Sequence, residues 1–126
     1  MSVPSKSEIL TLRTDANMTS KEYFLVKANG DNDMDICGAG EIAIGALTND
    51  VADGSSTAKF LPVQVGGVIL VKCAGAISAG ARAMSDSNGE AVAATDGNNV
   101  FGTARETHAD NDIGAFYWSP FYLETT

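Results

Sequence analysis

The sequence has few positive charges. It carries 8 Lys and Arg residues against 16 Asp and Glu residues, a formal net charge of −8 over 126 residues. A nucleic-acid groove needs clustered Lys and Arg to displace counterions from phosphates, and an anionic membrane surface attracts the same two residue types. We therefore expect neither nucleic acid nor a membrane as a partner. The acidic surplus favours solubility.

Long apolar segments are also missing. The longest strongly apolar run lies around Val68–Val71, whereas a membrane-spanning helix needs about 20 consecutive apolar residues. Residues 1–14 lack the basic start and the continuous apolar segment of a secretory signal. We expect a protein that is made in a cytosol and kept there, or released from it by lysis.

Chemically reactive side chains are scarce. The chain has two cysteines, Cys37 and Cys73, and a single histidine, His108. Metal ligation needs more His or Cys than this, and no serine lies in a G-x-S-x-G nucleophile turn. We expect no catalytic residues, no cofactor and no bound metal. The cysteines are predicted to be reduced, small apolar residues, and His108 to lie at the surface.

The stretch from Val68 to Arg105 gives the clearest signals of local structure. Two turn sequences, Ser85–Gly89 and Asp96–Asn99, contain Asn-Gly or Asp-Gly between short extended pieces, which is a strong hairpin signal. Residues 74–80 are too rich in glycine for a helix. The stretch therefore predicts closely spaced short strands.

The rest of the chain follows the same pattern, because no segment keeps a 3.6-residue period over three turns. We expect an all-β protein with a loop over Asn29–Gly40 and a short tail from Ser119. Pro62 predicts an edge strand or a bulge, since proline cannot donate to a sheet. The predicted strands are Glu8–Arg13, Glu22–Lys27, Glu41–Leu47, Ala58–Val65, Val68–Val71, Ala81–Met84, Glu90–Thr95, Val100–Arg105 and Ile113–Trp118.

The length fits one domain. We expect residues 1–13 to form an N-terminal arm or edge strand and residues 14–126 a single small β-barrel. Much of the apolar content is Ala and Val, so the core should be thin and an oligomer interface is expected to complete it.

The two halves of the chain resemble each other. Ile44-Gly45 and Phe101-Gly102 lie 57 residues apart, and at the same offset Leu25-Val26 falls on Arg82-Ala83. The identities are few, but each half has the same order of strands, turns and an acidic loop. The pattern predicts two similar β units, with Gly45 and Gly102 in equivalent positions.

Two motifs imitate ligand sites. Asp31–Asp35 alternates oxygen ligands like the start of a calcium loop, but Ile36 and Ile42 stand where such a loop needs Gly and Glu. Gly38–Ala43 matches G-x-G-x-x-A, but no buried strand precedes it and no helix follows it. We interpret the first as a solvated acidic loop and the second as a turn.

Aromatic residues are concentrated near the C-terminus. Strand alternation places Phe116 and Trp118 on one face and Tyr117 on the other. One face is expected to join the core, and the other to fill a subunit interface or to stack on sugar rings.

Three segments carry a resemblance to a known family. They read Cys-Ala-Gly-Ala-Ile-Ser-Ala-Gly from residue 73, Ala-Met-Ser-Asp-Ser-Asn-Gly-Glu-Ala-Val-Ala-Ala-Thr from residue 83, and Val-Phe-Gly-Thr-Ala-Arg-Glu-Thr from residue 100. Together they resemble the capsid decoration, or cement, proteins of tailed phages, which are compact barrels of the β-tulip or β-clip kind. The resemblance covers roughly residues 40–118. It departs from the family at Ala81-Arg82, where an acidic residue is usual, and at Thr107–Asp112, which lacks the customary glycine.

The resemblance implies a structural virion protein that sits as a trimer on the outside of an icosahedral head. Its partners would be the major capsid protein and further copies of itself, and it would have no catalytic residues. An adhesion or glycan-binding β-domain is the alternative. We expect contacts with the capsid or with other subunits at Val3, Pro4, Ile9, Leu10 and Trp118.

Overall fold

The computed structural model describes residues 8–30, 33–48 and 59–124. In these ranges the chain forms ten strands and no helix. The described residues therefore contain no helix that could span a membrane. The all-β prediction is confirmed. The strands are β1 (Glu8–Thr14), β2 (Leu25–Ala28), β3 (Met34–Ile36), β4 (Gly45–Leu47), β5 (Lys59–Gly66), β6 (Val68–Lys72), β7 (Arg82–Ser85), β8 (Ala91–Ala93), β9 (Asn98–Ala104) and β10 (Ile113–Leu123).

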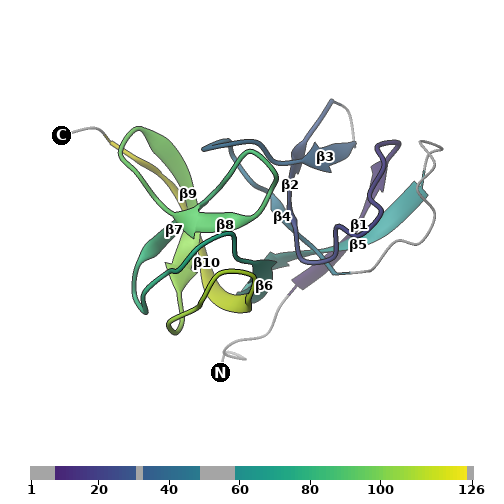
Figure 1. Ribbon diagram of the computed structural model, residues 1–126. Coiled ribbons are helices and arrows are strands. Elements are labelled where there is room, and N and C mark those ends of the chain that lie inside the picture. Colours follow the sequence, from purple (N-terminus) through teal and green to yellow (C-terminus); the bar gives the residue numbers. More distant parts are fainter. Residues whose placement is uncertain (1–7, 31–32, 49–58, 125–126) are drawn as a thin grey trace, which may run out of the picture.

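The strands make two antiparallel sheets of five, one from each half of the chain. The first unit, β1 to β5, has the order β1-β5-β4-β2-β3, and the second unit, β6 to β10, has the order β6-β10-β9-β7-β8. These two orders are the same when each strand is matched to the strand five places later. In Figure 1 the first unit runs from purple to teal on the right, and the second from green to yellow on the left.

The register repeats as well as the order. In the first unit Val26 pairs with Gly45, and 57 residues later Ala83 pairs with Gly102. The prediction that the two glycines are equivalent is confirmed, and with it the prediction of two similar β units. The edge strands β1 and β6 also match, but with a different spacing along the sequence. Leu10 on β1 and Ile69 on β6 occupy matching positions against β5 and β10.

Each sheet curls until its two edge strands meet. One parallel bridge joins Arg13 to Asp33 in the first unit, and the matching bridge joins Cys73 to Ala91 in the second. An ion pair spans each of these seams, Arg13 with Asp33 and Lys72 with Glu90. The same closure in both units gives the barrel-like shape that the sequence predicted.

The core is shared between the units. Its larger cluster combines Leu25 and Ala46 of the first unit with Ile69, Phe101 and Phe116 of the second. A smaller cluster, around Met18, Met34 and Leu47, belongs to the first unit alone. Part of the second unit is therefore buried against the first.

Three parts of the predicted strand pattern were wrong. Residues 41–47 were expected to be a strand, but only Gly45–Leu47 form one. Residues 29–40 were expected to be a loop, but they contain β3, which pairs with β2 through Lys27 and Asp35. The chain was expected to leave the sheet at Ser119, but β10 continues to Leu123 along β9. A register shift between Trp118 and Phe121 takes up Pro120, which has no N–H to donate.

The prediction for Pro62 was also wrong. It lies in β5, which has β1 on one side and β4 on the other, and no register shift falls there. Thr48, the first residue after β4, donates its N–H to the Pro62 carbonyl at 3.2 Å. Pro62 has no N–H and so cannot donate a hydrogen bond back to Thr48. This is tolerated because Thr48 lies beyond the end of β4.

Candidate contact surfaces

The open edge of β1 exposes two large apolar residues. Ile9 and Leu10 are each 52% exposed, although they point to opposite faces of the strand. Leu10 matches Ile69 of the second unit, which is fully buried. The two other predicted contact residues at this end, Val3 and Pro4, lie outside the described residues.

Backbone groups of Thr11 also point out of this edge. Thr11 pairs with Pro62, whose carbonyl accepts from Thr48 on the β4 side. Thr11 and Pro62 therefore form a non-hydrogen-bonded pair, and the N–H and C=O of Thr11 face away from β5.

In the second unit, the matching position on the edge strand β6 is covered. Leu70 of β6 corresponds to Thr11, and its N–H donates to Gln64 Oε1 at 3.0 Å while Gln64 Nε2 donates to its carbonyl at 3.3 Å. The buried Gln64 side chain therefore takes the place of a neighbouring strand at that point. Among the described residues, β1 has no such cap at Thr11.

Only part of the Trp118 side chain is exposed and therefore free to contact another protein. Its ring lies against Phe101, with centroids 6.4 Å apart, and it packs on the shared core while remaining partly exposed. Tyr117 lies on the opposite face, as strand alternation predicted, and is 49% exposed.

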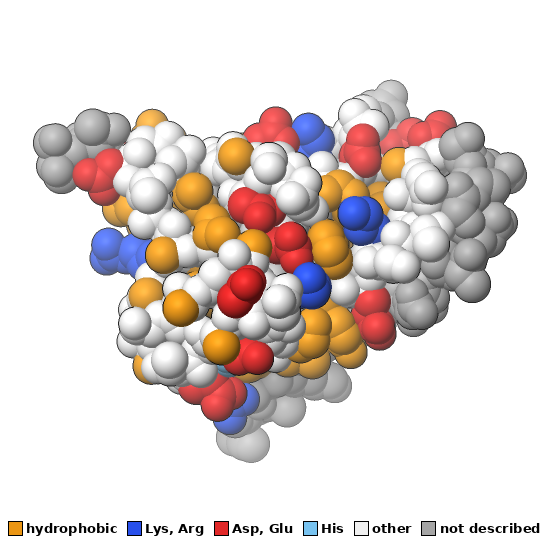
Figure 2. All heavy atoms as spheres, in the orientation of Figure 1, with side chains coloured by type: hydrophobic (Ala, Val, Ile, Leu, Met, Phe, Trp, Pro, Cys, Tyr) orange, Lys and Arg blue, Asp and Glu red, His pale blue; other side chains and the backbone are white. Residues whose placement is uncertain are grey.

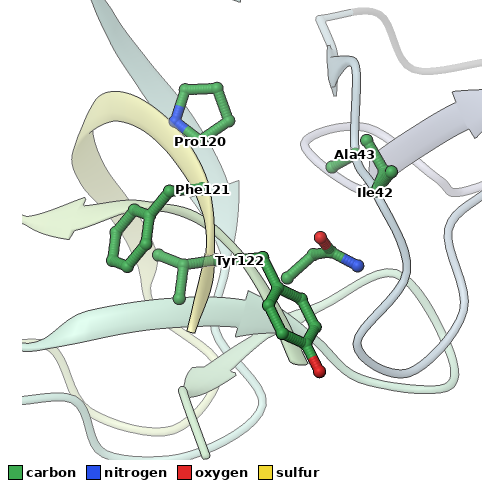
Figure 3. Close-up of a pocket in the computed structure, with 7 residues that line it drawn as sticks. Ile42, Ala43, Pro120, Phe121 and Tyr122 are labelled. Carbon is green, nitrogen blue, oxygen red and sulfur yellow. The ribbon is translucent and has the colours of Figure 1, made fainter. Parts of the chain in front are cut away.

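A shallow groove of about 200 Å³ lies between the two units. Ile42 and Ala43 of the first unit form one wall, and Pro120, Phe121 and Tyr122 at the end of β10 form the other (Figure 3). Ile42 is 66% exposed and Tyr122 56%. Sequence reasoning missed this groove because it expected residues 41–47 to be a strand and residues after 118 to be a tail.

A second hollow, of about 470 Å³, shares Ile42 in its lining. Ala28 and Ile44 line it together with an ion pair in which Lys27 Nζ lies 2.9 Å from Glu41 Oε1. The hydrogen bond from Lys27 lowers the pKa of Glu41, and the Gly38 N–H lowers it further. The lining of this hollow therefore combines apolar side chains with one charge of each sign.

The acidic residues that the structure describes do not form a metal site. Asp33 pairs with Arg13, and Asp35 accepts a hydrogen bond from the Ile36 N–H. Within the described ranges, no three His, Cys, Asp or Glu side chains are placed to hold an ion. Acidic side chains are spread over the face in Figure 2, and few Lys or Arg lie among them.

The single histidine and the two cysteines are buried. His108 was expected at the surface, but it is 5% exposed and packs over Gly114 and against Phe116. Gly114 explains the burial, because a side chain there would collide with the imidazole ring. Cys37 and Cys73 are buried free thiols, as predicted. Burial raises the pKa of Cys73 to about 11, with Asp112 adding to the effect.

The comparisons with known proteins agree with this picture. A family model described as phage cement protein matches residues 4–116. No curated protein matches the sequence. The chain is similar to a solved structure described as the head fiber gp8.5 N base of bacteriophage phi29, with a TM-score of 0.70 and 20% sequence identity. That match covers 90% of this chain and 95% of the other, and at this identity it shows the fold alone.

Proposed function

Because the chain belongs to the phage cement protein family, we propose that it binds the outer surface of an icosahedral phage head as a trimer and stabilises the shell. Membership makes it a structural protein associated with the phage capsid. The proposal adds the major capsid protein and further copies of the chain as partners. It also adds synthesis in the host cytoplasm and the absence of catalytic activity.

The open edge of β1 is the observation that carries the proposal. It offers the outward N–H and C=O of Thr11 next to the exposed apolar side chains of Ile9 and Leu10. An extended segment of a capsid subunit can add to such an edge through main-chain hydrogen bonds, while its side chains pack on Ile9 and Leu10. We assign Val3, Pro4, Ile9 and Leu10 to this contact, with Trp118 contributing only its exposed part.

Shell stabilisation follows from binding alone. A ligand that binds the intact shell better than the broken one shifts the balance by RT ln(1 + [L]/Kd) at each site, which is about 2.7 kcal/mol at 100 Kd. The effect recurs at every site of the lattice, so an interface of modest size is sufficient.

Binding to heads that lack the protein tests the proposal. Purified protein is mixed with such heads, and bound protein is measured after sedimentation. The double variant Ile9→Asp, Leu10→Asp should bind at least about tenfold more weakly, because it places charges in an apolar contact. Ile113→Asp, at a residue 44% exposed on β10, is the matched control and should bind normally. Equal binding by the double variant would contradict the assignment of the β1 edge.

Adhesion or glycan binding is a second candidate, favoured by the exposed aromatic side chains of β10. Tyr117, Phe121 and Tyr122 are 49%, 39% and 56% exposed, and aromatic faces stack on sugar rings. Glycan binding that is lost in Tyr122→Ala, by a protein that does not bind heads, would favour this candidate over the first.

A further inference from the structure

The two units touch through a contact that is not symmetric. The turn at Gly40 of the first unit inserts against the second unit, where Gly40 N donates to Ser85 O at 3.0 Å and Asn99 N donates to Gly40 O at 3.1 Å. Beside it, the Leu25 N–H donates to Gly89 O at 2.7 Å.

A twofold arrangement would repeat these bonds with the units exchanged. The counterparts of Gly40 and Ser85 are Gly97 and Ala28, which would then meet within the chain. Instead, Gly97 N donates to Leu123 O in its own unit, and Ala28 is exposed. The contact is therefore head-to-tail. The first unit uses its turn and the second unit uses its receiving face, so the receiving face of the first unit and the turn of the second are left out of the contact.

The unused face of the first unit is apolar and open. Ala28 and Ile42 are the counterparts of Ser85 and Asn99, which receive the Gly40 turn in the second unit. Ser85 is 1% exposed, whereas Ala28 is exposed and Ile42 is 66% exposed. These two residues line the hollow of about 470 Å³ described above.

The unused turn of the second unit has the matching shape. Thr95–Gly97 corresponds to Gly38–Gly40, and both turns end on a glycine in the left-handed region, with φ of 86° at Gly97 and 66° at Gly40. Thr95 and Asp96 are exposed. The molecule thus carries both halves of a contact that it already makes once internally.

We propose that a second copy of this chain covers the open face. The turn Thr95–Gly97 of one copy packs on the Ala28 and Ile42 surface of the next copy, in the way that the Gly40 turn packs on the second unit. The Gly97 carbonyl takes the acceptor role of Gly40, while Gly97 N keeps its bond to Leu123 O. This inference rests on the proposed trimer and names its interface.

A head-to-tail contact of this kind closes into a ring when the rotation between copies allows it. In a closed trimer the same type of contact would alternate within and between chains. The β1 edge takes no part in it and stays available for the capsid.

Site-directed cross-linking tests the interface. Ile42→Cys and Asp96→Cys are combined in one chain and treated with a short bis-maleimide, both free at tens of micromolar and bound to heads. Native Cys37 and Cys73 are buried and should not react. We expect cross-linked dimers and trimers as the main products. Monomers alone in both settings would overturn the inference, as would an equal ladder from the control pair Ile113→Cys and Asp96→Cys.

Ile42→Asp gives the second readout. The side chain is exposed, so the variant should fold normally, which its melting temperature checks, yet self-associate at least about tenfold more weakly. Ile113→Asp is the control. A variant that still forms trimers would refute the interface while leaving the proposed trimer intact. A wild-type protein that is monomeric in solution and on heads would refute the trimer itself.

Discussion

At the scale of single residues, Gly45 and Gly102 are positions where the backbone of the neighbouring strand leaves no room for a side chain. A Cβ atom at Gly45 would collide with the main-chain oxygen of Gln64, and one at Gly102 with that of Tyr117. Both collisions are with backbone, which cannot move aside as a flexible side chain could. The neighbouring strand therefore excludes any side chain at this point in both units.

Gly102→Ala should lower the free energy of unfolding by more than about 2 kcal/mol, because it overpacks the β9–β10 pair. Chemical denaturation measures the loss. Gly75→Ala is the control, since a Cβ there has open space, and it should change stability by less than about 0.5 kcal/mol. Equal effects of the two variants would show that the close approach at Gly102 is unimportant.

The buried thiol of Cys73 should make the free energy of unfolding depend on pH. Burial raises its pKa to about 11, so the folded protein keeps the neutral thiol while the unfolded chain ionises near the ordinary value. The stabilisation is complete below the ordinary pKa and is lost as pH rises toward about 11. The free energy of unfolding should therefore fall between these values, and fall less steeply in Cys73→Ala. Identical slopes in the two proteins would contradict the shift.

The sequence predicted some residues well and others poorly for a physical reason. The equivalence of Gly45 and Gly102 was visible because repeated backbone geometry preserves glycine. The burial of His108 was not, because it depends on space above Gly114, more than five residues along the chain. Exposure of Ile42 likewise depends on what the second unit leaves uncovered.

At the scale of elements, the two edge strands β1 and β6 differ in how their edges are treated. Gln64 covers the edge of β6 at Leu70, whereas no described residue covers the matching Thr11 of β1. Open edges invite pairing with another chain. This difference between two otherwise similar units is why we propose β1 as the binding element.

Thr11→Pro tests this difference. It removes an N–H that points out of the sheet, so the protein should remain as stable as the wild type but bind heads at least about tenfold more weakly. Leu12→Pro, one residue along, removes an N–H that faces β5 and should clearly destabilise the fold, because a hydrogen bond of the sheet is lost. Normal head binding by Thr11→Pro would show that main-chain pairing at this edge is not used.

Most strands were predictable from β-branched runs bounded by Asn-Gly and Asp-Gly turns. β3 was not, because Met34–Ile36 is short and follows an aspartate-rich segment that looks like a loop. The extension of β10 was hidden by Pro120, which normally ends a strand and is here taken up by a register shift. The second of these errors concealed one wall of the groove, Pro120–Tyr122.

At the scale of the whole molecule, the shared core couples the two units. Leu25 of the first unit lies in the same buried cluster as Phe101 and Phe116 of the second. The single tryptophan, Trp118, packs against this cluster from the second unit and reports on its unfolding.

Leu25→Ala should therefore lower the stability of both units together. We expect a loss of about 2 to 5 kcal/mol, with the same midpoint by Trp118 fluorescence and by circular dichroism. The same two midpoints are measured for Leu47→Ala as a comparison, because Leu47 lies in the cluster that belongs to the first unit alone. If Leu25→Ala left the fluorescence transition in place while shifting the dichroism, the units would fold independently.

Rupture of DNA-filled heads tests the central claim most directly. Heads lacking the protein are heated with and without a saturating amount of it, and DNA release is followed with an intercalating dye. Stabilisation by binding predicts a higher rupture temperature for saturated heads, with no increase for the Ile9→Asp, Leu10→Asp variant at the same concentration. Saturated heads that release DNA at the same temperature as bare heads would contradict the claim.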